Sequence, residues 1–185
     1  MRTIRPRVFE TNSSSAHCIV VADKESFQKF KDGELFADAW WYKCPYQADL
    51  ITFDTVYAKY INDVNHTRDW DRIHHDHNDI VILSKDAIRW LFSNPVVLSD
   101  SMSGCDIENY IRVWSTGSLR DELLEYLDSG YGFATSWVYS QYHPISYTML
   151  RYFTQEFATE YDDYRSEHPH ENADGNIEMR AVWYF

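Results

Sequence analysis

The sequence predicts an α+β fold in a single domain, residues 1–185, whose mixed or mostly antiparallel sheet includes N- and C-terminal strands and carries helices packed on it. Three observations lead to this prediction. The 185 residues are 44% hydrophobic and 17% aromatic, which is enough for one sizeable core. Runs typical of strands lie near both ends of the chain. Capped segments with helical periodicity lie between them, with too little strand–helix alternation for a doubly wound sheet.

The first half of the chain alternates strand-like runs with two predicted helices. Arg7–Phe9 and Cys18–Ala22 are short runs that fit strands. The segment "DKESFQKFKDG" predicts a short helix, which Asp23 caps and Gly33 ends. The run "ELFADAWWYK" has the aromatic density of a strand. After it, "DTVYAKYINDV" spaces its apolar residues as a helix does.

The second half is richer in helix signals. Ile80–Leu83 predicts a short strand, and Ser84 then caps a helix that Pro95 ends. The segment "PVVLSD" predicts another strand, and "GSLRDELLEYLDSG" predicts a helix with Ser118 and Asp121 in capping-box spacing. The remaining predicted elements are one long helix, a loop and the last strand, over residues 146–166, 166–176 and 177–185.

Negative charge accumulates along the chain. The 17 basic and 29 acidic residues leave a net charge of −12. Either the acidity only keeps the surface solvated, or it forms a face that meets a basic partner. Direct binding of DNA or RNA is disfavoured, because phosphates would be repelled over most of the surface. The net charges of residues 1–50, 51–100, 101–150 and 151–185 are 0, −3, −4 and −5.

The cysteine content and the hydropathy of the sequence indicate in which cellular compartment the protein is expected. Cys18, Cys44 and Cys105 are far apart and odd in number, so they fit reduced thiols in a cytoplasm better than disulfides. The N-terminus lacks the apolar stretch of a signal peptide, and no run approaches the ~20 apolar residues of a membrane span. We therefore expect a cytoplasmic protein without a membrane partner.

Two histidine-rich segments are candidate metal sites. The segment "NHTRDWDRIHHDHND", from Asn65 to Asp79, lacks the spacing of known zinc motifs, so an exposed, acid-rich loop is the preferred interpretation and metal binding the alternative. The segment "HPHENADGN" departs from the calcium-loop pattern. Glycine-based nucleotide motifs are missing as well. We expect no metal and no cofactor.

Carboxylates stand beside tyrosines on the helices predicted in the second half. Pairs of them, such as Glu122 and Glu125, are three residues apart and share a helix face. Because like charges on one face cost stability, this pattern suggests a surface shaped for a basic partner; solubility is the alternative. The candidate binding residues are Glu122, Glu125, Asp128, Glu160, Asp162 and Asp163.

The polar run Glu10–His17 has two interpretations. It fits a turn between the first two strands, in which the asparagine and serine side chains bond to nearby backbone. Alternatively, Glu10 or His17 acts as a base and one of Ser13–Ser15 as a nucleophile, although no Gly-x-Ser-x-Gly elbow surrounds them.

The same run carries a family resemblance. It resembles the N-terminus of a broad family of small phage and prophage proteins, and it departs from their pattern at Cys18, where serine is usual. The resemblance covers about a dozen residues. The matching positions are Phe9, Glu10, Thr11, Asn12, Ser13, Ser14, Ser15 and His17.

Size, acidity and phage character also resemble type II anti-CRISPR proteins. This resemblance implies an inhibitor without catalysis of its own. It would bind the RNA-guided effector nuclease with its guide RNA, in the host cytoplasm, through an acidic, aromatic-rich surface. The alternatives are a small phage hydrolase or transferase that uses Glu10, Ser13–Ser15 and His17, and a phage structural or assembly protein.

Overall fold

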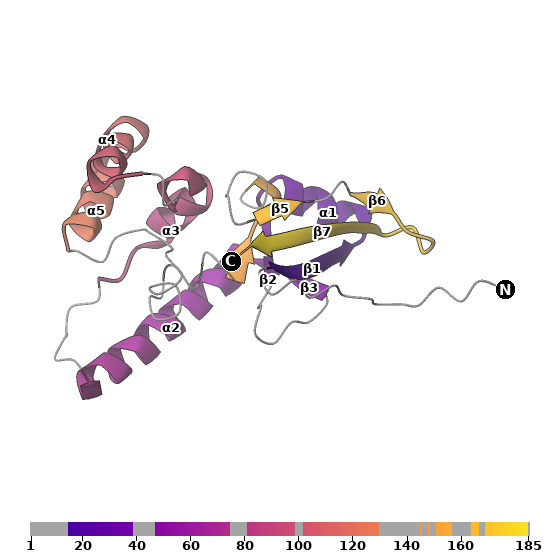
Figure 1. Cartoon of the computed structure of the whole chain (residues 1–185), viewed down its shortest axis with the longest axis horizontal. Coiled ribbons are helices and arrows are strands. Elements are labelled where there is room, and N and C mark those ends of the chain that lie inside the picture. Colours follow the sequence, from indigo (N-terminus) through magenta and orange to yellow (C-terminus); the bar gives the residue numbers. More distant parts are fainter. Residues whose placement is uncertain are drawn as a thin grey trace.

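The described residues form a seven-stranded mixed sheet at one end and a group of helices at the other (Figure 1). The structure is a computed structural model. It describes residues 15–38, 47–74, 81–98, 102–129, 145, 148, 151–156, 164–166 and 169–184. The strands are β1 Ser15–Ala22, β2 Leu35–Asp38, β3 Gln47–Thr52, β4 Tyr152–Phe153, β5 Tyr164–Ser166, β6 His170–Glu171 and β7 Ile177–Tyr184.

The sheet confirms the predicted α+β class and the pairing of strands from both ends of the chain. Its order is β4-β2-β3-β1-β7-β5, and β6 also pairs with β7. The longest ladder is the antiparallel pairing of β1 with β7, which runs from Ser15 opposite Tyr184 to Ala22 opposite Ile177. The pairing of β1 with β3 is parallel, which makes the sheet mixed.

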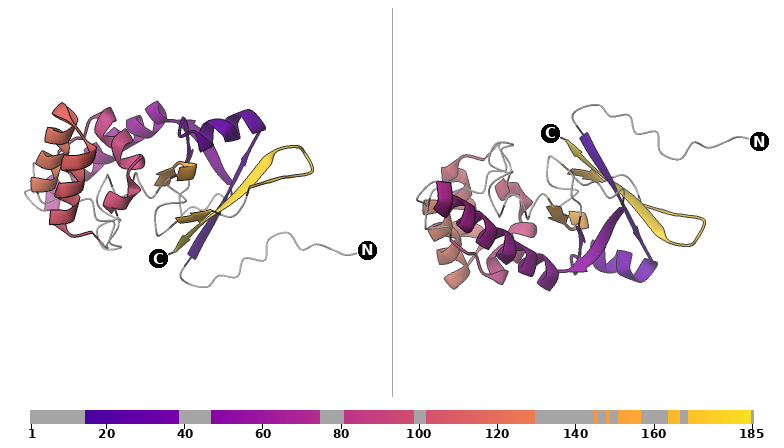
Figure 2. Two further views of the ribbon diagram at one scale, coloured as in Figure 1. Left: turned by 90° about the horizontal axis from the view of Figure 1, so that it is seen from above. Right: turned by 90° about the horizontal axis from the view of Figure 1, so that it is seen from below.

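Helix α1, Lys24–Lys31, follows β1 and packs on the sheet (Figure 2). It starts and stops where the sequence predicts. The Asp23 carboxylate accepts a hydrogen bond from the Ser26 amide at 2.9 Å, which caps the start of the helix. Gly33 has a φ of 75° just beyond the C-terminal end of the helix. Phe27 and Phe30 lie on its buried side. The helix therefore connects β1 to β2 while its two phenylalanines pack into the core.

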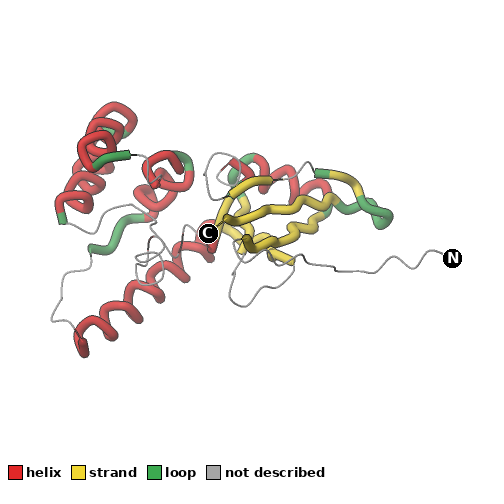
Figure 3. The backbone as a smooth tube through the Cα atoms, viewed as in Figure 1, coloured by secondary structure: helices red, strands yellow, loops and turns green. Residues whose placement is uncertain are grey.

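Helix α2, Phe53–His74, is longer than the sequence predicted and connects the sheet end to the helical end (Figure 3). Val56, Tyr60 and Val64 are buried along its first half. Residues 65–74, which we expected in an exposed loop, are helical, so that prediction was wrong. The helix propagates through them because extending a formed helix fixes one residue per added hydrogen bond.

The helical end consists of four elements that follow α2. They are α3 Lys85–Phe92, the 3₁₀ helix η1 Pro95–Leu98, α4 Gly104–Trp114 and α5 Gly117–Asp128. Ser84 caps α3 as predicted. Residues 95–98 form η1 rather than the predicted strand, because Pro95, Val97 and Leu98 are buried together on one short turn. Helix α4 was not predicted.

Residues 81–84 form no strand, contrary to the strand predicted for Ile80–Leu83, of which Ile80 lies outside the described residues. Their backbone is paired by side chains of α2 instead. The Tyr60 hydroxyl accepts the Leu83 amide at 3.1 Å, and the Tyr57 hydroxyl donates to the Leu83 carbonyl at 3.1 Å. These two bonds satisfy a buried backbone that has no neighbouring strand.

Two predictions about the later helices were also wrong. Helix α5 begins after Thr116 without a side-chain cap, and Asp121 lies beside Arg120 at 3.6 Å instead of forming a capping box with Ser118. A φ of 60° at Gly117 turns the chain into this helix.

Residues 146–166 are not one helix, since β4 and β5 lie within them. Pairing of β4 with β2 buries Tyr152 and Phe153, which outweighs their helical spacing.

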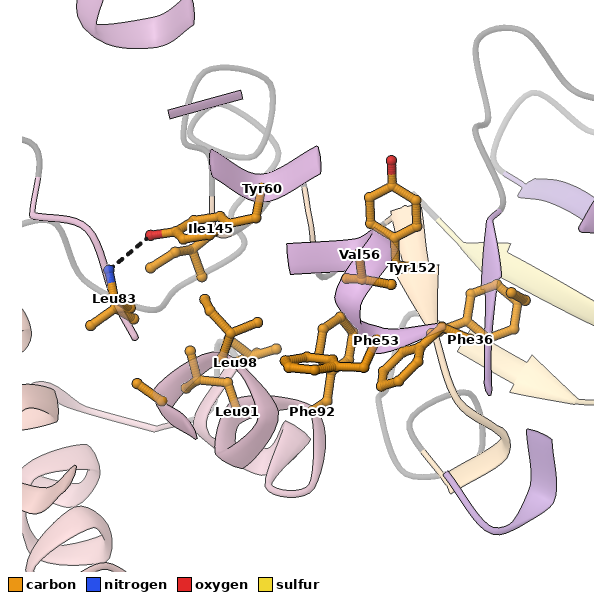
Figure 4. Close-up of a cluster of buried hydrophobic side chains, with 14 of the residues drawn as sticks. Phe36, Phe53, Val56, Tyr60, Leu83, Leu91, Phe92, Leu98, Ile145 and Tyr152 are labelled. Carbon is orange, nitrogen blue, oxygen red and sulfur yellow. Dashed lines mark hydrogen bonds between the residues drawn. The ribbon is translucent and has the colours of Figure 1, made fainter. Parts of the chain in front are cut away.

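One hydrophobic core runs from the sheet into the helices (Figure 4). Phe36 of β2 meets Phe92 of α3 edge to face, with ring centroids 4.9 Å apart, and also contacts Phe53 of α2 at 5.6 Å. Such pairs add to the free energy of burial. The two ends of the molecule are therefore joined through buried aromatic rings.

Candidate protein-binding face

The candidate face is the outward side of the hairpin formed by α4 and α5, which pack side by side (Figure 2). Ile107, Ile111, Leu123 and Tyr126 are buried and hold the two helices on the core. Six acidic and two basic residues lie between residues 104 and 128, so the hairpin carries a net charge of 2 − 6 = −4. The acidic residues are Asp106, Glu108, Asp121, Glu122, Glu125 and Asp128.

Glu125 and Asp128 are the two predicted binding residues that lie where a partner could reach them. Both are exposed, near the end of α5. Neither forms an ion pair with any residue in the described part of the chain. Their charge is therefore uncompensated locally and adds to the negative potential of the hairpin.

Glu122, by contrast, is not a free surface carboxylate, and its role in binding stays a prediction. It is partly buried, and its carboxylate accepts hydrogen bonds from the Ser84 amide and from the Ser84 hydroxyl, the latter at 2.7 Å. It thus completes the N-terminal cap of α3. The shared helix face with Glu125 remains, but Glu122 serves the fold.

The other carboxylates of the hairpin have local partners. Glu108 forms an ion pair with Arg112 within α4, at 2.7 Å. Asp106 accepts the Ser103 hydroxyl at 2.6 Å and amide at 3.2 Å, and these hydrogen bonds lower the pKa of Asp106. Asp121 lies beside Arg120. The charge available to a partner is therefore greatest at Glu125 and Asp128.

An aromatic cluster that the sequence did not predict lies at the start of the hairpin turn. The Tyr110 ring of α4 meets Trp90 of α3 edge to face and is tilted against Trp114 of α4, with ring centroids 6.1 and 6.0 Å apart. Trp114 is 64% exposed and Val113 is 70% exposed. The spacing of Tyr110 and Trp114, four residues apart, was the signal that could have indicated a shared helix face.

The remaining predicted residues are placed only in part. Glu160, Asp162 and Asp163 lie outside the described residues, as do Phe9 to Ser14 of the family motif. Ser15 and His17 lie in β1, where they pair with Tyr184 and Val182. Residues 15–17 are therefore part of a strand rather than of the turn predicted for them.

A second charged cluster connects three segments that are far apart in the sequence. The Asp38 carboxylate of β2 forms ion pairs with Lys59 of α2, at 2.8 Å, and with Arg151, at 2.7 Å. Both cations also lie over the Tyr152 ring, at 5.5 and 5.1 Å. Arg151 and Lys59 lower the pKa of Asp38 despite its partial burial. Sequence spacing offers no signal for a contact between residues 38 and 151.

Asp63 lies one helical turn beyond Lys59 on α2. Burial raises the pKa of Asp63 to about 6, against the opposing influence of Arg151, His66 and Lys59. Carboxylates with raised pKa values are frequent at functional sites but also occur in structural ion networks. The ion pairs of Asp38 favour a structural network here, because they join β2 to α2 and to the residue that precedes β4.

The described residues hold no group of three or more His, Cys, Asp or Glu side chains placed to bind a metal ion. Of the histidine-rich segment, His66 is exposed on α2, His74 ends that helix, and residues 75–79 lie outside the described residues. Among the described helices, none combines the length and apolar character needed to cross a membrane.

The exposed carboxylates Glu125 and Asp128 therefore lie near the end of α5, and the exposed Trp114 lies at the end of α4, where the hairpin turns. Comparison with known proteins provides no relative for this chain: no protein-family model, curated protein or solved structure matches it.

Proposed function

We propose that this protein inhibits a partner by binding it through the acidic face of the α4–α5 hairpin. The observation that carries the proposal is the pair of exposed carboxylates, Glu125 and Asp128, on a hairpin with a net charge of −4. Opposite charge steers association and sets its salt dependence. Tyrosine and tryptophan at the same hairpin are the residue types that dominate interface energetics.

The proposed partner is the RNA-guided nuclease of a type II CRISPR system with its guide RNA. The N-terminal resemblance to phage proteins supports this choice, together with the overall charge of −12. Such nucleases hold nucleic acid in positively charged channels. An acidic protein in a channel would compete with DNA, whereas one bound elsewhere would hold the nuclease domains in an inactive arrangement.

Association with the purified nuclease–guide complex tests the proposal. The double variant Glu125→Lys/Asp128→Lys should bind at least tenfold more weakly at low salt, mainly through slower association. The salt dependence of its affinity should also be smaller, because attraction between exposed charges is screened over ~8 Å at physiological salt.

The matched control reverses two exposed acidic residues at the sheet end, in Glu34→Lys/Asp174→Lys. It changes the net charge equally and should retain the binding of the unmodified protein within a few-fold. Equal losses in the two double variants would mean that only total charge matters. No binding by the unmodified protein would refute the proposed partner. DNA competition at saturating inhibitor then separates a steric from an allosteric mechanism.

A further inference from the structure

The sequence contains two aspartate–glycine steps, Asp32–Gly33 and Asp174–Gly175. In such a step the amide nitrogen of the glycine can attack the side chain of the aspartate, because glycine has no Cβ to block the approach. Glycine follows the aspartate at both sites, and both aspartates are exposed. The chemistry of the two steps is therefore matched, and the surrounding structure decides whether they differ.

Helix α1 holds the first step closed. The Gly33 amide donates to the Phe30 carbonyl at 3.2 Å, directly beyond the C-terminal end of α1. The Asp32 carboxylate accepts a hydrogen bond from Gln28 Nε2 at 2.8 Å. The Phe30 side chain is fully buried in the core. Freeing both reacting groups therefore requires the last turn of a core helix to open.

The second step lies in the turn between β6 and β7, at the end of the sheet away from the helices (Figure 1). The Gly175 amide donates to the Asn172 carbonyl at 3.1 Å. Both residues of β6 are exposed, so this bond can open by local unfolding that leaves the core intact. The exposed Asp174 side chain forms no hydrogen bond or ion pair within the described part of the chain, so it can turn toward the freed nitrogen.

We propose that Asp174 is a site of spontaneous covalent modification, at which the Gly175 amide converts aspartate to isoaspartate, whereas the fold protects Asp32. The Gly175 nitrogen forms a bond to Asp174 Cγ. A carboxyl oxygen leaves as water, with the carboxyl proton and the amide proton, which closes a cyclic imide. Water then adds to the former main-chain carbonyl of Asp174, the bond from that carbonyl to the nitrogen breaks, and the nitrogen regains a proton. The chain then continues through Cγ with its composition unchanged.

The modification would alter the turn, because isoaspartate lengthens the main chain by a methylene group between Asn172 and Asn176. Asn172 Oδ1 accepts the amides of Asp174 and Asn176, both at 3.0 Å, and the Asn172 amide donates to the Asn176 carbonyl at 2.8 Å. These bonds depend on the spacing of the ordinary chain. Amide hydrogen exchange at Asn172 and Asn176 should therefore become faster. The inference does not depend on the proposed function, since the α4–α5 hairpin lies at the other end of the molecule (Figure 1).

Peptide mapping after prolonged incubation tests the inference, with electron-based fragmentation in the mass spectrometer to distinguish isoaspartate from aspartate. Isoaspartate should accumulate at Asp174 and not at Asp32 in the folded protein. In guanidinium chloride, where both turns are unfolded, the two residues should be modified at similar rates. Asp174→Glu keeps the charge but would have to close a larger, less favourable ring, so this variant should show no modification of the turn.

Three outcomes would overturn the inference. The first is a folded protein without isoaspartate at Asp174. The second is equal accumulation at Asp32 and Asp174 in the folded protein, which would mean that α1 gives no protection. The third is an equally strong preference for Asp174 in guanidinium chloride, because the difference would then come from neighbouring residues in the sequence rather than from the fold.

Discussion

Glu122 of α5 accepts hydrogen bonds from both the backbone amide and the hydroxyl of Ser84, at the start of α3. The Ser84 hydroxyl in turn accepts the Ala87 amide at 3.2 Å. One carboxylate from a distant helix therefore completes the cap of another. This relationship changes which acidic residues are suitable for testing the binding face, because altering Glu122 would disturb the fold first.

Replacing Glu122 by alanine should lower the free energy of unfolding by about 1–2 kcal/mol, as loss of a helix cap does. Urea unfolding measures the change. Glu125→Ala, on the same helix, is the control and should stay within about 0.5 kcal/mol of the unmodified protein. In a double-mutant cycle, Ser84→Ala and Glu122→Ala should show coupling. Additive effects would mean that the two side chains act independently.

Tyr60→Phe should also destabilise the fold, by about 1–2 kcal/mol, because the buried Leu83 amide loses its hydroxyl acceptor. Tyr57→Phe should cost less, since the Leu83 carbonyl has two lone pairs and the Tyr57 side chain is only partly buried. Thermal unfolding of both variants gives the comparison. A Tyr60→Phe variant as stable as the unmodified protein would show that water replaces the hydroxyl.

Asp38→Asn should lower the free energy of unfolding by about 2 kcal/mol at neutral pH, because Lys59 and Arg151 would lose the charge of their shared carboxylate. The lowered pKa of Asp38 means that its stabilisation is present above its unfolded value of 3.8 and is lost as pH falls through the lower folded value. The difference in the free energy of unfolding between the variant and the unmodified protein should therefore become smaller in strong acid. A constant difference across pH would contradict this explanation.

Asp63→Asn should have the opposite pH dependence. The folded pKa of about 6 exceeds 3.8, so this carboxyl favours the folded state below pH 4, and that contribution is lost as pH rises through 6. Allowing for solvent screening, the variant should be about 1 kcal/mol more stable than the unmodified protein at pH 7.5 and equally stable near pH 4. Melting temperatures at both pH values measure this. A destabilised variant at pH 7.5 would show that ionised Asp63 is needed.

Local signals in the sequence predicted the elements that depend on neighbouring residues. Asp23 and Ser84 cap helices where their spacing indicates, and Gly33 lies just beyond the end of α1. The alternation of residues 177–185 predicted the last strand, which is β7, and this strand pairs with β1 as the predicted sheet requires. Short-range hydrogen bonds and side-chain alternation decide such features, so they can be read locally.

Contacts between distant residues decided the rest. Side chains of α2, Tyr57 and Tyr60, form hydrogen bonds with the backbone of Leu83, so residues 81–83 satisfy their polar groups without joining the sheet. Tyr152 and Phe153 pair with β2, which interrupts the helix that their spacing predicts. The acidic composition indicated a charged surface, but spacing alone could not distinguish exposed Glu125 from Glu122, which caps α3. Each outcome depends on which groups packing brings together, and a single helix or strand pattern does not contain that information.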